Sequence, residues 1–260
     1  MLSIRDMRHQ GRYMITAGTF PEPGQELRLQ GREARHLITV RRARPGDTLE
    51  LFDGRGNSWQ ALFAGCEAGT AVCSVQQVLP PGANGLWELT LASAVPRPKR
   101  MSFLVEKCAE LGVGQLIPVK WKHSPRLGKD SAALRWGRIA ESAAKQSGRA
   151  MLMQVADPVG AAELLPLIDC FDHVLLLDTA GGLAPGEALA GAGQGDRILA
   201  LVGPEGGFEA SELRSLRDAS GNRYRPVTLG PATLRVETAC IAIASTLLCE
   251  GLGRAARAPG

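Results

Sequence analysis

The sequence predicts an α/β protein in which a small β-rich domain precedes a mainly parallel sheet covered by helices. The first ~80 residues hold short strands separated by turn residues, at the spacing of a small barrel. From Trp87 onward, apolar strands alternate with helical patterns, which favours a sheet covered on both faces. The Pro- and Gly-rich segment 80–85 interrupts every pattern, so we expect domains at residues 1–80 and 86–260.

Two strands expected in the first domain alternate apolar and polar residues. Residues 48–52 and 59–63 flank the Gly-rich segment 53–57, which predicts a hairpin loop between two strands. A further strand is expected at 70–78, just before the proposed boundary.

The second domain opens with a strand at 89–94 and a helix that stops at Gly112. The helix is indicated by apolar residues at offsets of 3, 4, 7 and 10, namely Met101, Leu104, Val105, Cys108 and Leu111. The remaining elements expected are strands at 116–119, 174–178, 198–202 and 227–229, with a helix from about 132 to 146.

Composition and termini place the chain among ordinary globular proteins. No apolar run approaches the about 20 residues that span a bilayer, and the start lacks the apolar core of a signal peptide, so we expect a cytoplasmic protein. The six cysteines form no Cys-x-x-Cys pair and the four histidines are scattered, so we expect buried free thiols and no metal.

Charge is segregated along the chain. Residues 1–80 carry a net charge of +2, residues 81–155 carry +7 and residues 156–260 carry −5. A basic front beside an acidic end suits a protein that presents one face to a polyanion, although charges can also simply solvate a surface.

Two glycine-rich turns follow strands late in the chain. They are Gly-Pro-Glu-Gly-Gly-Phe at 203–208 and Leu-Gly-Pro-Ala-Thr-Leu-Arg-Val-Glu-Thr-Ala at 229–239. Glycines at the carboxyl ends of strands let the backbone approach a ligand closely. Neither turn has the Lys-Ser/Thr ending of a P-loop or the spacing of a dinucleotide fingerprint, so we expect a nucleoside held by backbone hydrogen bonds.

These two turns resemble those of the RsmE family, the bacterial 16S ribosomal RNA uridine N3-methyltransferases, which belong to the knotted SPOUT methyltransferases. Further blocks match in the same order, at 36–42, 51–54, 99–118 and 143–149. The resemblance implies a PUA-like RNA-binding barrel, a trefoil-knotted methyltransferase domain, a homodimer and the cofactor S-adenosyl-L-methionine.

The activity implied by the resemblance is methylation of N3 of a uridine, the family's uridine 1498, in the 16S rRNA of the small ribosomal subunit. Two alternatives remain: a SPOUT enzyme of other specificity, such as a ribose 2′-O-methyltransferase, and a non-catalytic rRNA-binding assembly factor. The barrel before the Gly-Pro-Glu-Gly-Gly motif argues against the first, and intact Arg235, Glu237 and cofactor turns argue against the second.

The resemblance also implies individual site residues. Arg235 is the expected donor to charge developing on the uracil oxygens, because its guanidinium does not give up a proton. Glu237 could accept the N3 proton, orient Arg235 or simply begin the last helix. The cofactor is expected to contact Asp178, Leu201, Gly203, Pro204, Glu205, Gly206, Leu229, Gly230, Leu234 and Thr238.

RNA contacts are expected from basic clusters and from the block that ends at residue 149. The residues are Arg32, Arg35, His36, Arg41, Arg42, Arg97, Lys99, Arg100, Lys122, Arg126, Gln146 and Arg149. The chain departs from the family pattern at Lys145 and at Lys122-His123, which leaves individual roles in these blocks open. Trp121 could be core or a stacking platform.

Overall fold

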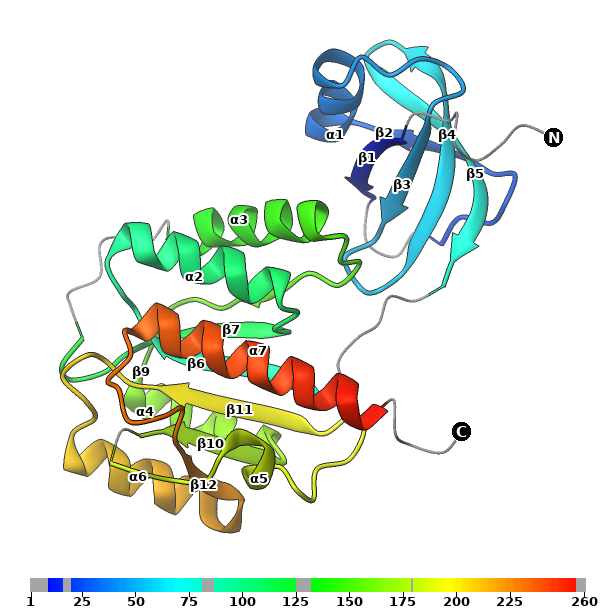
Figure 1. The fold of residues 1–260 in the computed structure, drawn as a ribbon. Coiled ribbons are helices and arrows are strands. Elements are labelled where there is room, and N and C mark those ends of the chain that lie inside the picture. The colour runs from blue at the N-terminus through cyan, green and yellow to red at the C-terminus, as the bar shows by residue number, and fades with distance from the viewer. Residues whose placement is uncertain (1–8, 16–19, 81–86, 125–131, 179, 256–260) are drawn as a thin grey trace. The chain divides into compact units, whose positions relative to one another are not determined.

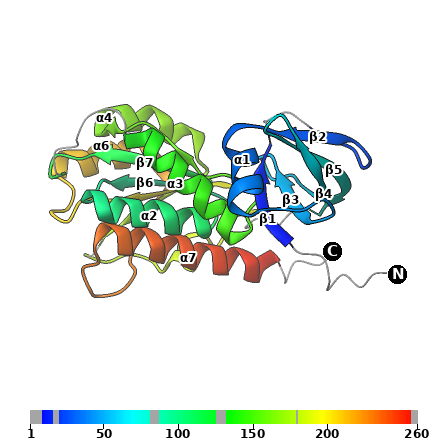
Figure 2. The same cartoon turned by 90° about the horizontal axis from the view of Figure 1, so that it is seen from above.

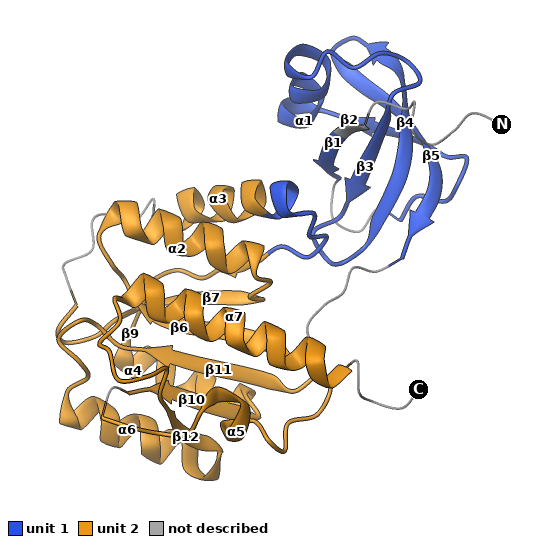
Figure 3. Cartoon of the chain, viewed as in Figure 1, with its two compact units in different colours: residues 1–83, 144–152 blue, residues 84–143, 153–260 orange. Residues whose placement is uncertain are grey.

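The computed structural model describes residues 9–15, 20–80, 87–124, 132–178 and 180–255. The chain forms two compact units, which Figure 3 colours separately. Unit 1 contains residues 1–83 and 144–152, and unit 2 contains residues 84–143 and 153–260.

Unit 1 is built on a five-stranded sheet (Figure 1). Its strands are β1 (His9–Met14), β2 (Glu26–Leu29), β3 (Thr48–Phe52), β4 (Ser58–Glu67) and β5 (Thr70–Leu79), in the order β1-β3-β4-β5-β2. All neighbours are antiparallel except β1 and β3. The strands predicted at 48–52, 59–63 and 70–78 are confirmed, and inward-facing Leu49, Leu51, Trp59 and Phe63 form their core.

A short helix, α1 (Gly31–Arg35), continues into a π-helical turn, His36–Val40. Ala34 and Leu37 anchor it in the barrel core, which leaves the arginines of this segment on the outside. The chain leaves it through Arg42, whose φ of 53° lies in the left-handed region.

Residues 144–152 belong to unit 1, whereas the sequence analysis placed them in the second domain. The Arg12 guanidinium donates to the carbonyls of Ala144 (3.2 Å) and Arg149 (2.8 Å). Lys145 Nζ lies 2.6 Å from Glu33 Oε1. The Leu152 amide donates to the Gly54 carbonyl. These contacts join the segment to barrel residues about a hundred positions away, so no local pattern could indicate them.

Unit 2 contains a seven-stranded sheet in which every pair is parallel. Its strands are β6 (Glu88–Ala94), β7 (Gln115–Lys120), β8 (Gln154–Val155), β9 (Val159–Gly160), β10 (His173–Leu177), β11 (Arg197–Val202) and β12 (Tyr224–Val227). The order is β12-β10-β11-β6-β7-β8, with β9 beside β7. The predicted parallel α/β sheet is confirmed, but the strand expected at 227–229 is β12, which ends at Val227.

Helices cover both faces of this sheet. Figure 2 shows α2 (Pro98–Glu110) and α7 (Val236–Ala255) on one face, with α4 (Ala161–Leu164) and α6 (Ala210–Ser220) on the other. The remaining α-helices are α3 (Ala132–Ser147) and α5 (Pro185–Ala188), and 3-10 turns occupy Leu165–Cys170 and Gly221–Arg223. The helices predicted before Gly112 and near 132–146 are confirmed.

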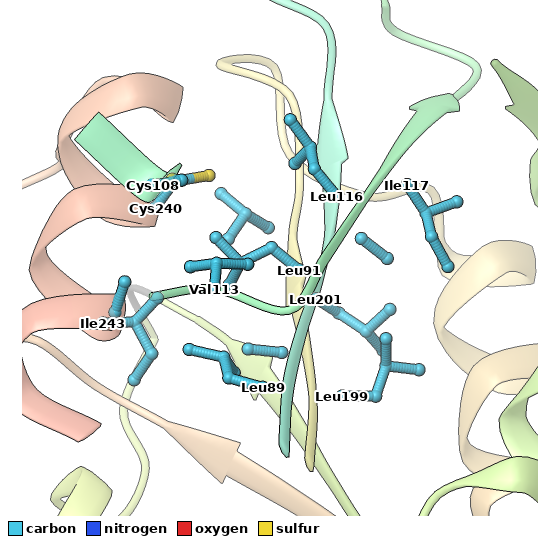
Figure 4. Close-up of a cluster of buried hydrophobic side chains, with 14 of the residues drawn as sticks. Leu89, Leu91, Cys108, Val113, Leu116, Ile117, Leu199, Leu201, Cys240 and Ile243 are labelled. Atoms are coloured by element: carbon cyan, nitrogen blue, oxygen red, sulfur yellow. The ribbon is translucent and has the colours of Figure 1, made fainter. Parts of the chain in front are cut away.

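The core of unit 2 lies on both faces of β6 and β11 (Figure 4). Leu89 and Leu91 pack toward Ile243 of α7, while Leu199 and Leu201 of β11 project from the opposite face. Cys108 and Cys240 lie buried where α2 meets α7. Helix α7 is long and apolar enough to span a membrane by length and composition alone, yet it packs on this sheet.

Candidate functional site

A cavity of about 430 Å³ opens where strands of unit 2 end. We call it the strand-end cavity. It is lined by Leu177, Asp178, Val202, Gly203, Pro204, Glu205, Gly206, Gly207, Phe208, Leu213, Val227, Leu229, Gly230, Ala232, Thr233, Leu234, Val236 and Ala239. The volume falls in the range of small-molecule sites.

The parallel sheet is the reason these segments meet. Because β10, β11 and β12 are neighbours and run in the same direction, their carboxyl ends share one edge. Both glycine-rich turns leave from that edge, one after β11 and one after β12, and the second leads into α7. Turns that are 26 positions apart in sequence therefore line one cavity.

Glycine is required in the first turn for two different reasons. A Cβ on Gly203 would lie 2.7 Å from the Phe208 ring, which no side chain tolerates. Gly207 has a φ of +75°, in the left-handed region that favours glycine. At Gly206 a Cβ would lie 3.2 Å from His123 Cβ, so this glycine reflects a close approach of the next loop.

The loop after β7 packs against the first glycine-rich turn and the start of α6. The Trp121 ring, 3% exposed, meets Phe208 edge-on with centroids 4.9 Å apart. The Lys122 amide donates to Glu212 Oε1 (2.9 Å), and its ammonium pairs with Glu209. Trp121 is therefore a core residue of this unit and not an exposed stacking platform.

An arginine links the cavity to the start of α7. Arg100 Nη1 lies 3.2 Å from Glu205 Oε1, and its Nε lies 3.4 Å from Glu237 Oε1. The Glu237 side chain is 9% exposed, and its Oε2 is buried without a hydrogen-bond partner in the described part of the chain. Of the roles considered for Glu237, its position in the first turn of α7 matches that of a helix-start residue.

Arg235 immediately precedes α7 and is exposed. Its carbonyl accepts the Ala239 amide at 2.8 Å, the first hydrogen bond of the helix. Its neighbours Leu234 and Val236 line the strand-end cavity, so the backbone of Arg235 lies beside the cavity, although Arg235 itself is not among the lining residues.

The structure brings most of the expected cofactor residues to the cavity. Those that line it are Asp178, Gly203, Pro204, Glu205, Gly206, Leu229, Gly230 and Leu234. Leu201 does not line it, because its side chain is fully buried in the sheet core. Thr238 is exposed on α7 and is not part of the lining either. Asp178 also accepts the Ala180 amide at 2.9 Å, as in an ordinary turn.

The basic residues expected to bind RNA in the barrel lie on its surface. Arg32, Arg35, His36, Arg41 and Arg42 are all exposed, on α1 and the turn that follows it. Arg32 lies 3.8 Å from Glu33, a weak surface pair. His36 stacks obliquely on Tyr13 with centroids 5.8 Å apart.

The other expected RNA residues lie in different surroundings. Arg97, Lys99 and Gln146 are exposed. Arg100 and Lys122 instead pair with carboxylates of their own unit, as described above. Arg149 is half-buried, and burial lowers the pKa of its guanidinium. Arg126 lies outside the described residues. No group of histidine, cysteine, aspartate or glutamate suited to a metal occurs among the residues that are described.

Sequence reasoning missed Arg12, whose side chain is 7% exposed and which holds the segment with Gln146 and Arg149 against the barrel. An arginine between a glycine and a tyrosine in an alternating strand gives no local indication of this role. Gly207, Phe208 and Leu213 also line the cavity without having been singled out as cofactor residues.

Comparison with known proteins agrees with this architecture. Residues 84–248 match the RNA methyltransferase domain family, and residues 29–65 match the RNA methyltransferase PUA domain. The chain is 30% identical over 238 residues to the ribosomal RNA small subunit methyltransferase E of Mycobacterium bovis, covering 85% of each protein. The Bacillus subtilis protein of that name is 26% identical over 229 residues, covering 84% of this chain and 88% of that protein.

A solved structure gives the same result in three dimensions. The ribosomal RNA small subunit methyltransferase E of Neisseria gonorrhoeae, bound to S-adenosyl methionine, superposes with a TM-score of 0.79 at 28% identity. The match covers 91% of this chain and 96% of that one. With both domain families matched in order and a relative at 30% identity along most of its length, the chain belongs to the ribosomal RNA small subunit methyltransferase E family.

Proposed function

We propose that this chain transfers a methyl group from S-adenosylmethionine to N3 of a uridine in 16S rRNA of the small ribosomal subunit, the position numbered 1498 in the family. The observation that carries the proposal is the strand-end cavity, which is lined by the two glycine-rich turns that follow β11 and β12, the parallel strands on either side of β10. Membership of a family named for methylation of small-subunit rRNA supports the substrate class.

The residues of the cavity fit the cofactor. Backbone groups of the two turns can hydrogen-bond an adenine and a ribose, while Leu177, Val202, Leu229 and Leu234 offer apolar surface to the base. Carboxylates at Glu205 and Asp178 can accept hydrogen bonds from hydroxyl or ammonium groups. The bound cofactor supplies an electrophilic methyl group on a sulfonium.

The chemical demand on the protein is to favour the anion of uracil N3. Arg235 lies in the chain between two residues that line the cavity and carries a planar fork of donors, so it can stabilise charge that develops on the ring oxygens. Glu237 is poorly placed to take the N3 proton, because it is buried and paired with Arg100. A water or hydroxide at the rim is then the simplest proton acceptor.

Contact with RNA is proposed for two sets of exposed cations. One is the barrel set Arg35, Arg41 and Arg42, and the other is the pair Arg97 and Lys99 at the start of α2. Each phosphate contact adds close to one unit to the slope of log affinity against log salt. We propose a cytoplasmic location because the substrate is ribosomal RNA.

We also propose a homodimer, formed through the outer face of α7. The helix is apolar, with a mean hydropathy of 1.4, yet only 44% of it is buried within the chain. The small residues Ala239 and Ala244 of this helix are buried against the chain's own core. Ile241, Ala242 and Leu252 remain partly or largely exposed and would form the contact instead.

The decisive experiment maps methylated nucleosides in 16S rRNA from cells with and without the gene. We expect one 3-methyluridine to disappear on deletion and to return with the wild-type gene but not with Arg235→Ala. Loss of a ribose 2′-O-methyl group instead would reassign the chemistry. Unchanged methylation with altered subunit assembly would point to a non-catalytic factor.

A further inference from the structure

We propose that Arg100 is a positioning residue of the cofactor site, which holds Glu205 at the strand-end cavity for a hydrogen-bond donor of the cofactor. This inference rests on the proposed function, in which that cavity binds S-adenosylmethionine. It differs from the role that the sequence suggested, in which Arg100 contacts an RNA phosphate together with its neighbours.

The first support is geometric. Arg100 makes two ion pairs, with Glu205 at 3.2 Å and with Glu237 at 3.4 Å. The two carboxylates come from different segments, the turn after β11 and the first turn of α7, and each of these segments lines the cavity. One guanidinium therefore joins the two halves of the site from the start of α2.

The second support is the burial of Glu237, whose carboxylate needs a neighbouring cation such as Arg100. The carboxylate is 9% exposed and one of its oxygens has no partner in the described part of the chain. A buried carboxylate is costly unless a cation lies beside it. Arg100 supplies that cation, and its side chain is 35% exposed. The guanidinium that anchors Glu237 is thereby directed to Glu205.

Glu205 is the part of this arrangement that can meet a ligand. Its side chain is 62% exposed and lines the cavity. Arg100 engages Oε1, so Oε2 can still accept a hydrogen bond. The cofactor carries two kinds of suitable donor, the ribose hydroxyls and the methionine ammonium. Without Arg100, Glu205 would sample many rotamers, and ordering it on binding would weaken affinity.

The adjacent cations at the start of α2 provide a contrast. Arg97 and Lys99 are exposed, and neither pairs with an acidic side chain within the described residues. They remain available for phosphate, whereas Arg100 does not. The basic cluster at 97–100 thus divides into two RNA contacts and one cofactor residue.

Calorimetric titration of the full chain with S-adenosylmethionine tests this division. We expect Arg100→Met to weaken binding roughly tenfold, the scale of one charge-assisted hydrogen bond, and Arg100→Lys to lose less. The matched control Lys99→Met should bind the cofactor like wild type and lose RNA affinity with a shallower salt slope. Titration with 5′-methylthioadenosine, which lacks the amino acid, separates the two donors. If Arg100→Met also binds this ligand more weakly than wild type, Glu205 meets the ribose hydroxyls; if its affinity for this ligand is unchanged, Glu205 meets the methionine ammonium.

A second variant separates positioning from misfolding. Arg100→Met leaves Glu237 buried without a cation, and adding Glu237→Gln removes that charge. If the double variant recovers stability but still binds the cofactor weakly, Arg100 acts through Glu205. Recovery of affinity in the double variant overturns the proposal, as does wild-type affinity in Arg100→Met. A wild-type chain that binds no cofactor overturns the proposed function itself, and this inference with it.

Discussion

Replacing Arg12 by Met should selectively release the segment 144–152 from the barrel. The Arg12 side chain is 7% exposed, and its guanidinium donates to Glu50 Oε1 (2.6 Å) and to the carbonyls of Ala144 and Arg149. It also lies 4.9 Å from the centre of the Phe52 ring. Methionine can fill the apolar part of this space but can replace none of the hydrogen bonds.

The expected cost follows from those contacts. Removing one partner of a buried ion pair costs about 3–5 kcal/mol, because the other charge is left without compensation. Glu50 is 22% exposed and can recover some water, so the lower end, about 3 kcal/mol, applies. That is a large fraction of the about 5–15 kcal/mol by which a typical domain is stable.

Hydrogen exchange measured by mass spectrometry reports on this directly. The amides of Leu152 and Gly56 bond across the junction, to the carbonyls of Gly54 and Ala150. A loss of about 3 kcal/mol should speed their exchange by about a hundredfold or more.

The matched control is Arg28→Met. Arg28 also pairs with a glutamate, Glu67, but the two side chains are 52% and 63% exposed, so we expect less than about 1 kcal/mol. Equal effects of the Arg12 and Arg28 changes would refute the reasoning, since they would show that water replaces the Arg12 guanidinium without cost.

Three further outcomes can be checked on the same protein. Glu33→Gln and Lys145→Met should show a coupling energy of about 1–2 kcal/mol in a double-mutant cycle of unfolding, because the two charges lie 2.6 Å apart and their side chains are only 17% and 19% exposed. Additive effects of the two changes would contradict a stabilising ion pair. Arg42 and Ala68 have φ angles of 53° and 47°, in a region that favours glycine, so changing either residue to Gly should raise the free energy of unfolding in urea by up to about 1 kcal/mol. Only Arg42→Gly should also weaken RNA binding. A lower free energy of unfolding in both variants would contradict the argument from backbone strain. Burial raises the pKa of the Cys240 thiol to about 12, so iodoacetamide at pH 8.5 should alkylate Cys240 only after denaturation. The contribution of this thiol to the free energy of unfolding should be lost as pH rises from about 9 toward 12, because the thiol ionises first in the unfolded chain. Alkylation of Cys240 in the native protein would contradict this.

The parts of the fold that the sequence predicts correctly are those with a local cause. Strands β3, β6 and β11 and helix α2 each carry an apolar periodicity within a dozen residues, so their pattern identifies them without a neighbour. Strand β12 departs from its expected position because Val227 to Leu229 has strand-forming residues, whereas pairing with β10 runs through Tyr224 to Val227. Pro226 is tolerated there because β12 is an edge strand.

Site residues could be predicted where the position of the backbone after a strand places them in the site. They were predicted less well where a side chain contacts a partner that is distant in sequence. The glycine turns line the cavity because their position after parallel strands fixes where they lie. The family resemblance implied that Leu201 contacts the cofactor, but the pleat of the strand points its side chain into the core. The ion pair of Arg100 with Glu205 spans 105 positions, and no spacing rule indicates it.

The ion pairs of unit 2 change how the segregated charge of the chain is interpreted. Residues 81–155 carry +7 and residues 156–260 carry −5, which suggested a basic face toward RNA. Part of that charge is neutralised within unit 2, since Arg100 pairs with Glu205 and Glu237, and Lys122 pairs with Glu209.

Neutralised cations release no counterions when RNA binds, so they cannot contribute to its salt dependence. Arg97→Ala and Lys99→Ala should each flatten the log–log slope by about one unit, while Lys122→Ala should leave it nearly unchanged. Nitrocellulose-filter binding to a 16S rRNA fragment over a range of salt measures all three. A full unit of slope lost with Lys122→Ala would mean that its pairing with Glu209 breaks when RNA binds, and that the acidic end of the chain competes with RNA for the same cations.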